Sequence, residues 1–226
     1  MRVLRPFAAV VFDMDGTLLD TELVYKEIVW EVSGGLGFQM TETVHLGMVG
    51  SSNEVSNQLL TEAYGVTFPF ALFDAECRRL MHARMAQSVP VKAGAPELLA
   101  ELKARDIPMA VATSSRATHA LAHLGTAGLL DMFATVVTRS DVTHPKPHPE
   151  PYLLAAGRLG VAPADCLAIE DSHSGVRAAH GAGMQTVMVP DLVPPNDEIR
   201  ALCDAVMESL VAVRAAAFQD ERISST

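Results

Sequence analysis

The chain has 226 residues, of which 49% are hydrophobic and 19% are charged. This composition is typical of a folded protein with a sizeable core and argues against intrinsic disorder. At about 150 residues per domain, the length predicts one or two domains. The formal charge of −10 disfavours binding to nucleic acid or to an anionic membrane, because both need a basic face.

Three scattered cysteines without a C-x-x-C pair argue against a disulfide framework or a zinc cluster and favour a reducing compartment. We expect His173 and the other histidines to be surface or core residues. No apolar run approaches about 18 residues, so we expect no membrane-spanning helix. Only a six-residue apolar run follows Arg5, so we expect no secretory signal. These features predict a cytoplasmic protein, a monomer or a weak homodimer.

The first predicted element is a strand over residues 7–12, an apolar run that Asp13 ends. Helical patterns follow it instead of a second strand. The first covers 22–33, the second runs from a capping box at 51–54 to Gly65, and the third covers 70–87. We interpret residues 21–88 as an α-helical domain inserted after the first strand.

Strand and helix patterns then alternate to the end of the chain. Continuously apolar runs predict buried parallel strands over 107–112, 133–137, 166–169 and 185–189. Helices are predicted over 96–105, 149–159 and 174–183, with Pro96 and Pro149 suited to a first turn and Gly160 to a C-cap. This alternation predicts an α/β fold in which residues 1–20 and 89–226 form a doubly wound parallel sheet.

Chemistry-bearing residues follow several of these strands, where an open α/β sheet binds its ligands. Asp13 and Asp15 come directly after the first strand, and Gly16 permits the turn that would aim both carboxylates into one pocket. Such a pair suits a division of labour between a nucleophile or metal ligand and a general acid/base. A solvated turn is the alternative for a bare D-x-D-G.

Two further strand ends carry a hydroxyl and an ammonium group. Thr113, followed by Ser114 and Ser115, could donate to a phosphoryl oxygen, with one of the serines capping the next helix. Lys146 lies between two prolines, which restrict its backbone and help to aim its charge. Taken alone, each of these residues is more often a cap or a solvated lysine.

Glu170 and Asp171 end the 166–169 strand. Adjacent carboxylates on a buried strand repel each other unless a cation holds them, and oxygen ligands suit Mg²⁺. A helix cap is the alternative interpretation. A phosphoryl dianion beside these acids needs the cation and Lys146, because two unit charges 4 Å apart interact by ~4 kcal/mol at an effective dielectric constant of 20.

The ordered set resembles the haloacid dehalogenase-like hydrolase superfamily, in the subfamily with a helical cap after the first strand. Residues 12–18 look like its first motif, Thr113 its second, Lys146 its third and Glu170-Asp171 its fourth. The resemblance covers nearly the whole chain and implies a Rossmann-like catalytic core.

By this resemblance, the protein would be a Mg²⁺-dependent phosphatase of a small phosphorylated metabolite, such as a sugar phosphate or a phosphoglycolate-like acid. Asp13 would form an aspartyl-phosphate, and Asp15 would act as acid and base. Mg²⁺ would be held by Asp13, the Asp15 carbonyl and Asp171, with Glu170 as a ligand or beside one. Thr113, Ser114 and Lys146 would bind the phosphoryl group.

Substrate contacts are expected from Gly50 and Ser51 in the inserted domain and from Arg116 in the core. A β-phosphoglucomutase shares these motifs, but it grips a second phosphate, and residues 49–52 contain no Arg or Lys. The mutase stays an alternative, because Arg116 could reach the site from the core. A phosphate-binding or receiver-like signalling module is the non-enzymatic alternative. Such receivers are about half this length and lack D-x-D-G-T and an inserted cap.

Overall fold

The computed structural model describes residues 4–49 and 53–218. These fall into two compact units, one formed by residues 4–20 and 90–218 and the other by residues 21–49 and 53–89. We call them unit 1 and unit 2 and describe each by itself.

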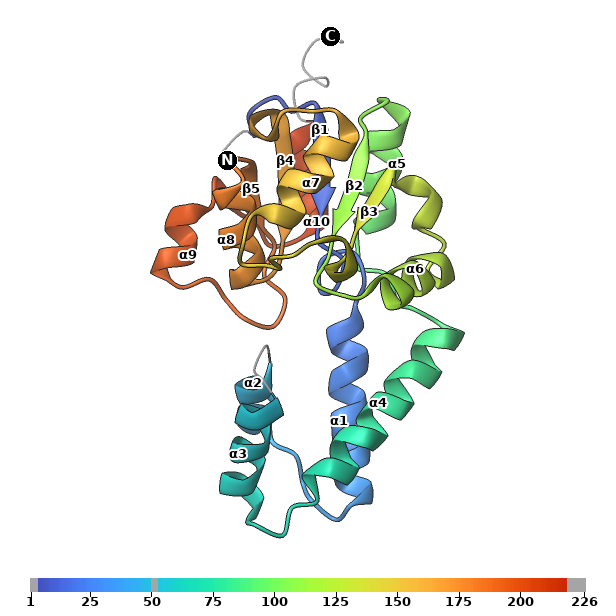
Figure 1. The fold of residues 1–226 in the computed structure, drawn as a ribbon, viewed down its shortest axis with the longest axis vertical. Helices are drawn as coiled ribbons and strands as arrows, with labels where there is room; N and C mark the ends of the chain where they lie inside the picture. Colours follow the sequence, from blue (N-terminus) through green and yellow to red (C-terminus); the bar gives the residue numbers. More distant parts are fainter. Residues whose placement is uncertain (1–3, 50–52, 219–226) are drawn as a thin grey trace. The chain divides into compact units, whose positions relative to one another are not determined.

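Within the described ranges of unit 1, six parallel strands form one sheet with the order β3-β2-β1-β4-β5-β6 (Figure 1). The strands are β1 (Ala9–Phe12), β2 (Met109–Ala112), β3 (Thr135–Val137), β4 (Cys166–Glu170), β5 (Gln185–Met188) and β6 (Ala205–Val206). Their side chains are almost all buried, as continuously apolar strands covered on both faces require. The expected α/β parallel sheet is confirmed.

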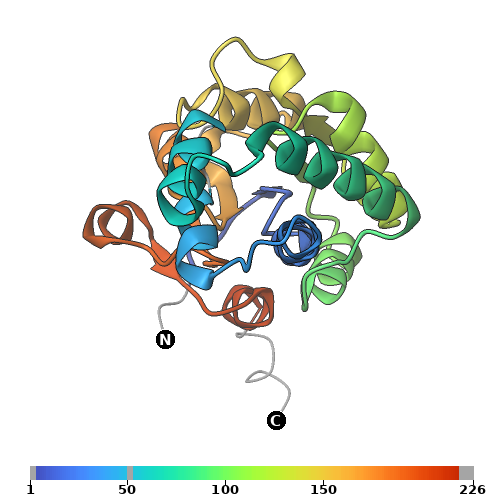
Figure 2. The same cartoon turned by 90° about the horizontal axis from the view of Figure 1, so that it is seen from below.

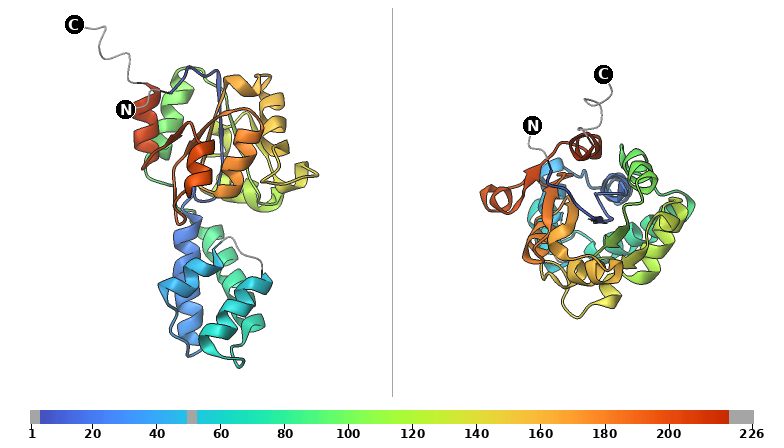
Figure 3. Two further views of the ribbon diagram at one scale, coloured as in Figure 1. Left: turned by 90° about the vertical axis from the view of Figure 1, so that its left-hand side faces the viewer. Right: turned by 90° about the horizontal axis from the view of Figure 1, so that it is seen from above.

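Helices cover both faces of this sheet (Figures 1 and 3). The α-helices of unit 1 are α5 (Ala95–Ala104), α6 (Ala117–Thr126), α7 (Glu150–Leu159), α8 (His173–Gly181), α9 (Asp197–Leu202) and α10 (Leu210–Ala217), with short 3₁₀ turns at η1 (Leu130–Met132), η2 (Arg139–Asp141) and η3 (Pro163–Asp165). Helices α7 and α8 pack against one face, and α5 and α10 pack together on the other. Gly160 is the left-handed C-cap of α7, as its sequence position predicts.

Unit 2 is formed by α1 (Thr21–Gly35), α2 (Glu42–Met48), α3 (Asn53–Tyr64) and α4 (Phe70–Gln87). Helix α1, seen end-on in Figure 2, packs against α4, and α2 packs against α3. A separate core of apolar side chains fills this unit, with Ile28, Leu60 and Phe73 among its most buried members. Helix α2 was not indicated by the sequence pattern, whereas α1, α3 and α4 lie where helices were expected.

The two chain segments that lead to unit 2 lie side by side in unit 1. The Asp20 backbone N–H donates to the Pro90 carbonyl, and the Lys92 N–H donates to the Leu18 carbonyl, each at 2.9 Å. The Lys92 ammonium also pairs with Asp20 at 3.1 Å and with Asp191 at 2.6 Å. These contacts hold the two ends of the inserted segment next to each other in unit 1.

The strand order places a switch point between β1 and β4. From β1 the chain builds β2 and β3 on one side, and it then returns to build β4, β5 and β6 on the other. Ligands of open α/β sheets bind at the carboxyl ends of the strands beside such a reversal. Because Phe12 is in register with Ile169, the next residues, Asp13 and Glu170, emerge there as neighbours.

Close packing of α8 on β4 requires a glycine in the first turn of the helix. A Cβ at Gly175 would lie 1.7 Å from Glu170 Oε1, whereas a Cβ at Gly181 in the same helix would lie 3.7 Å from its nearest neighbour, Pro149 Cβ. Any side chain at position 175 must therefore displace the buried Glu170 carboxylate.

We expect Gly175→Ala to lower the free energy of unfolding by about 2 kcal/mol, because overpacking forces buried groups to move. Gly181→Ala is the matched control and should leave stability unchanged or raise it by up to about 1 kcal/mol, since alanine favours helix. Urea unfolding followed by circular dichroism measures both. Equal stability of the two variants would contradict the packing argument.

Candidate active site

One ammonium group links the ends of β1 and β4. Lys146 Nζ lies 2.5 Å from Asp13 Oδ1 and also donates to Glu170 Oε1. The lysine side chain is 3% exposed, and those of Asp13 and Glu170 are 10% and 0% exposed. Burial opposes the charged form of Lys146, but the two carboxylates outweigh it and raise the pKa of this ammonium. The lysine is therefore a fixed positive charge within the cluster.

Glu170 is surrounded by donors on both oxygens. Its Oε1 accepts from Lys146 and from the Tyr152 hydroxyl, the latter at 2.7 Å. Its Oε2 accepts from the backbone N–H of Asp171 at 3.2 Å and from the N–H and hydroxyl of Ser172 at 3.1 and 3.0 Å. The repulsion expected between Glu170 and Asp171 is thus relieved on the Glu170 side by protein donors.

Tyr152 is a site residue that the sequence did not indicate. It lies on α7, is fully buried, and places its ring 5.1 Å from Lys146 Nζ. Burial and the nearby Glu170 carboxylate raise the pKa of its hydroxyl, which keeps it a donor. Its position inside an apolar helix pattern carries no local signal of this contact.

Asp171 lies against the turn that follows β1. Its Oδ1 accepts from the Thr17 hydroxyl at 3.1 Å. Gly16 has a φ of +86°, and a Cβ there would lie 2.4 Å from Asp171 Oδ2. The glycine of the D-x-D-G-T string therefore serves both the turn and the close approach of this carboxylate.

Asp15 faces the loop after β2. Its Oδ2 accepts from the Ser115 hydroxyl at 2.7 Å and from the Thr113 hydroxyl at 3.5 Å. Thr113 Oγ1 also accepts from the Ser115 backbone N–H at 3.0 Å. The expectation that Ser114 or Ser115 caps the next helix was wrong. Helix α6 begins after Arg116 without a side-chain cap, because the Ser115 hydroxyl is directed to Asp15 instead.

The remaining expected residues lie outside this cluster. Ser114 and Arg116 are exposed on the loop between β2 and α6. Gly50 and Ser51 lie outside the described residues. The structure thus brings together Asp13, Asp15, Thr113, Lys146, Glu170 and Asp171 from four segments of the chain.

The carboxylates of this cluster have a donor set that fits a divalent cation. One oxygen each of Asp13, Glu170 and Asp171 lie within 4.8 Å of one another. Burial, followed by repulsion from neighbouring carboxylates, raises the pKa of Asp171, and burial outweighs Lys146 to raise that of Asp13. A hard cation would offset this repulsion, and carboxylate oxygens are the ligands that such ions prefer.

Two features of the geometry define what the site can do chemically. Lys146 neutralises one of several buried negative charges, and a divalent cation would neutralise two more. Asp13 and Asp15 leave the same turn but have different partners, an ammonium for Asp13 and hydroxyls for Asp15. Two carboxylates in different environments can act as nucleophile and as acid/base in group transfer.

Comparisons with known proteins agree with this arrangement. The haloacid dehalogenase-like hydrolase family matches residues 10–189. The "Probable pseudouridine-5'-phosphatase" of Drosophila melanogaster is 39% identical over 204 residues, which cover 84% of each chain. The fructose-1-phosphate phosphatase YqaB of Escherichia coli (strain K12) is 35% identical over 186 residues, or 81% of this chain and 96% of that one.

A solved structure of related sequence has the same fold. The crystal structure of a HAD family hydrolase from Deinococcus radiodurans R1, with bound phosphate and sodium, superposes with a TM-score of 0.83. It is 29% identical, and the match covers 93% of this chain and 95% of that one. With the family match over most of the sequence, the resemblance predicted from the motifs is confirmed, and the chain belongs to the haloacid dehalogenase-like hydrolases.

Proposed function

We propose that the protein is a Mg²⁺-dependent phosphatase that hydrolyses a small phosphorylated metabolite through an aspartyl-phosphate on Asp13. The observation that carries this proposal is the buried ammonium of Lys146 between Asp13 and Glu170. This ammonium opposes the effect of burial on the pKa of Asp13, and together with a bound cation it would favour the ionised nucleophile where an anionic phosphoryl group must approach. The phosphatase names of relatives 35% and 39% identical support the same reaction class.

The proposed reaction has two steps. A carboxylate oxygen of Asp13 attacks phosphorus, and the bond from phosphorus to the leaving oxygen breaks as Asp15 gives that oxygen a proton. Asp15 then takes a proton from water, whose oxygen attacks phosphorus and breaks the bond to Asp13. Inorganic phosphate leaves, and both carboxyl groups return to their starting states.

We assign the phosphoryl oxygens to Lys146 and Thr113 of the cluster, and we keep Ser114, on the exposed loop beside Thr113, as a further expected contact. Asp13 and Asp171 would hold Mg²⁺ together with the carbonyl of Asp15, and the ion would supply charge neutralisation at the phosphoryl group. Because both oxygens of Glu170 already accept from protein donors, we assign Glu170 to holding Lys146 in place. In this assignment Glu170 does not itself bind Mg²⁺.

Charge pairing in unit 2 favours a hydrolase over a mutase. Residues 21–89 contain four Lys and Arg side chains. Each is ion-paired with a carboxylate of the same unit: Lys26 with Glu42, Arg78 with Asp74, Arg79 with Glu76, and Arg84 with Glu27 and Glu31. A mutase needs a cation for the second phosphate of its bisphosphate, and these cations are already engaged.

A cavity of about 210 Å³ within unit 2 has a composition that suits hydroxyl groups. Beside apolar residues, its lining includes the polar side chains of Glu22, Tyr25, His45, Asn53, Ser56 and Asp74. His45 is buried, and within the described residues neither of its ring nitrogens has a hydrogen-bond partner. Burial lowers the pKa of His45, so its neutral ring can donate and accept. We propose that this unit serves as a cap whose cavity contacts an uncharged, hydroxyl-rich leaving group.

Asp13→Asn should abolish turnover, with a fall in kcat of about a thousandfold or more, because the amide is a poor nucleophile. The fold should remain, since Lys146 keeps its contact with Glu170. Phosphate release and thermal unfolding measure the two effects. Asp165→Asn, an exposed change before β4, is the control. Activity above a few per cent in Asp13→Asn would exclude the nucleophile assignment.

Asp171→Ala should raise the Mg²⁺ concentration for half-maximal activity by about tenfold or more, because a carboxylate ligand is lost. A Mg²⁺ titration of phosphate release gives this value. The exposed Asp131→Ala variant should titrate like the wild type. An unaltered titration in Asp171→Ala would remove Asp171 from the metal site.

The reaction class itself is tested with a panel of phosphorylated metabolites. We expect phosphate release from monophosphates of sugars, polyols or nucleosides in the presence of Mg²⁺, without any added bisphosphate. Nuclear magnetic resonance of the products separates hydrolysis from isomerisation. Interconversion of sugar phosphates that depends on a sugar bisphosphate would establish the mutase alternative instead.

A further inference from the structure

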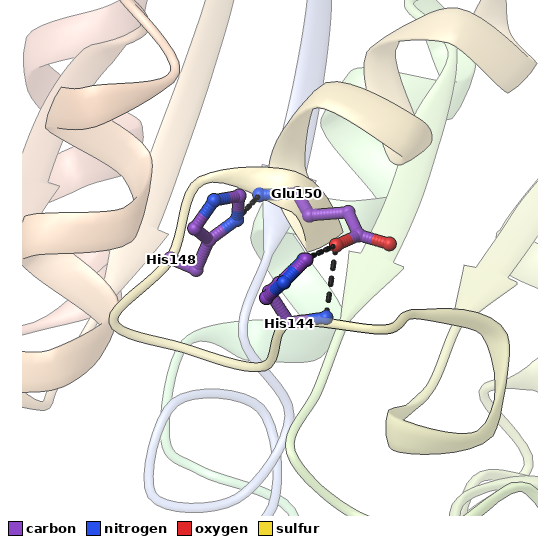
Figure 4. A group of neighbouring side chains, drawn as sticks. All are labelled: His144, His148 and Glu150. Atoms are coloured by element: carbon purple, nitrogen blue, oxygen red, sulfur yellow. Dashed lines mark hydrogen bonds and ion pairs between the residues drawn. The ribbon is translucent and has the colours of Figure 1, made fainter.

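The segment that carries Lys146 presents a second group of ligand-type side chains on its outer side. His144, His148 and Glu150 each offer a ligand atom, and these atoms lie within 4.8 Å of one another (Figure 4). The His144 side chain is 63% exposed and that of Glu150 is 30% exposed, whereas Lys146 is 3% exposed. One short segment therefore directs Lys146 into the carboxylate cluster and directs His144, His148 and Glu150 outward.

Hydrogen bonds direct both imidazoles toward Glu150. His144 Nδ1 lies 2.9 Å from Glu150 Oε2, and the Glu150 backbone N–H donates to His148 Nδ1 at 3.2 Å. A nitrogen that accepts a hydrogen bond bears a lone pair, so His148 Nδ1 is unprotonated and its proton is on Nε2. Both Nδ1 atoms thus lie beside Glu150.

The carboxylate of Glu150 is held in place and ionised. Its Oε1 accepts from the Thr143 backbone N–H at 2.8 Å, and its Oε2 accepts from the His144 N–H at 2.9 Å. These backbone donors, with His144, lower the pKa of Glu150 to about 2. Pro145, Pro147 and Pro149 further restrict the segment, which reduces the entropy lost when its side chains are fixed.

We propose that His144 Nδ1, His148 Nδ1 and a carboxylate oxygen of Glu150 form a binding site for a borderline divalent transition metal such as Zn²⁺. Two imidazoles and one carboxylate are a common zinc ligand set, with water in the fourth position. The proposal differs from the expectation that the histidines serve only as surface or core residues. It goes beyond the phosphatase reaction and does not depend on it.

The geometry requires only small movements. At metal–ligand bonds of 2.0–2.1 Å, two ligands of a tetrahedral site lie about 3.3 Å apart. The His144 Nδ1–Glu150 Oε2 pair at 2.9 Å would open slightly, and the wider separations would close by rotation of exposed side chains. On metal binding, the proton on His144 Nδ1 would pass to solvent, or the ring would carry its proton on Nε2 instead. The Glu150 backbone N–H, which now donates a hydrogen bond to His148 Nδ1, would donate to water.

Ligand chemistry separates this site from the catalytic carboxylates. Imidazole nitrogens favour Zn²⁺ over Mg²⁺, whereas the all-oxygen cluster at Asp13 and Asp171 favours Mg²⁺. Millimolar Mg²⁺ should therefore occupy the carboxylate cluster and leave the histidine site open to Zn²⁺.

Isothermal titration of the full chain with Zn²⁺ in millimolar Mg²⁺ tests the proposal without using activity. We expect one zinc ion per chain, and we expect the affinity to fall at least about tenfold in His144→Ala and in His148→Ala. Circular dichroism checks that both variants are folded. Visible absorption of bound Co²⁺ provides a second readout, since it depends on the ligands and their geometry.

Two controls separate this site from others. His119→Ala removes one ring of the His119–His123 pair on α6, and Asp171→Ala removes a carboxylate of the catalytic cluster. Both should bind Zn²⁺ like the wild type. The proposal is overturned if micromolar protein binds no Zn²⁺ at a Zn²⁺ concentration about 100-fold higher. It is also overturned if the wild type and both histidine variants bind Zn²⁺ with equal affinity, or if Asp171→Ala loses binding.

Discussion

One buried ammonium group, that of Lys146, links the carboxyl ends of β1 and β4, where the proposed active site lies. The side chains of Asp13, Lys146 and Glu170 are 10% exposed or less, and such charges are stable in a protein interior only when they are paired and hydrogen-bonded. Removing one partner of a buried ion pair typically costs 3–5 kcal/mol, because the other charge is left uncompensated. Lys146 therefore supports both the fold at the β1–β4 junction and the ionised state of the proposed nucleophile.

Much of this arrangement follows from local sequence. Continuously apolar runs predict the strands, and a parallel register then brings their polar ends together. The sequence alone therefore places Asp13, Thr113 and Glu170 at one edge of the sheet. The sequence pattern did not indicate strand β6, which is only two residues long. It also did not indicate helices α9 and α10, because both are short.

Contacts between side chains from distant segments were not predictable in the same way. Nothing in the pattern around Tyr152 distinguishes a buried hydroxyl that supports Glu170 from an ordinary core tyrosine. The Ser115 hydroxyl had two local options, a helix cap or Asp15, and only the tertiary structure selects Asp15. The loop around Lys146 likewise shows its outward histidines as neighbours only once the chain is folded.

The central claim is that Asp13, paired with the Lys146 ammonium, accepts the phosphoryl group. It is tested most directly by rapid quenching during turnover, followed by borohydride reduction and mass spectrometry of the peptide that contains Asp13. An aspartyl-phosphate is reduced to homoserine, so we expect homoserine at position 13, dependent on substrate and absent from Asp13→Asn. Reproducible phosphate release with homoserine at another carboxylate, or with none in a quench series that spans a single turnover, would contradict the account.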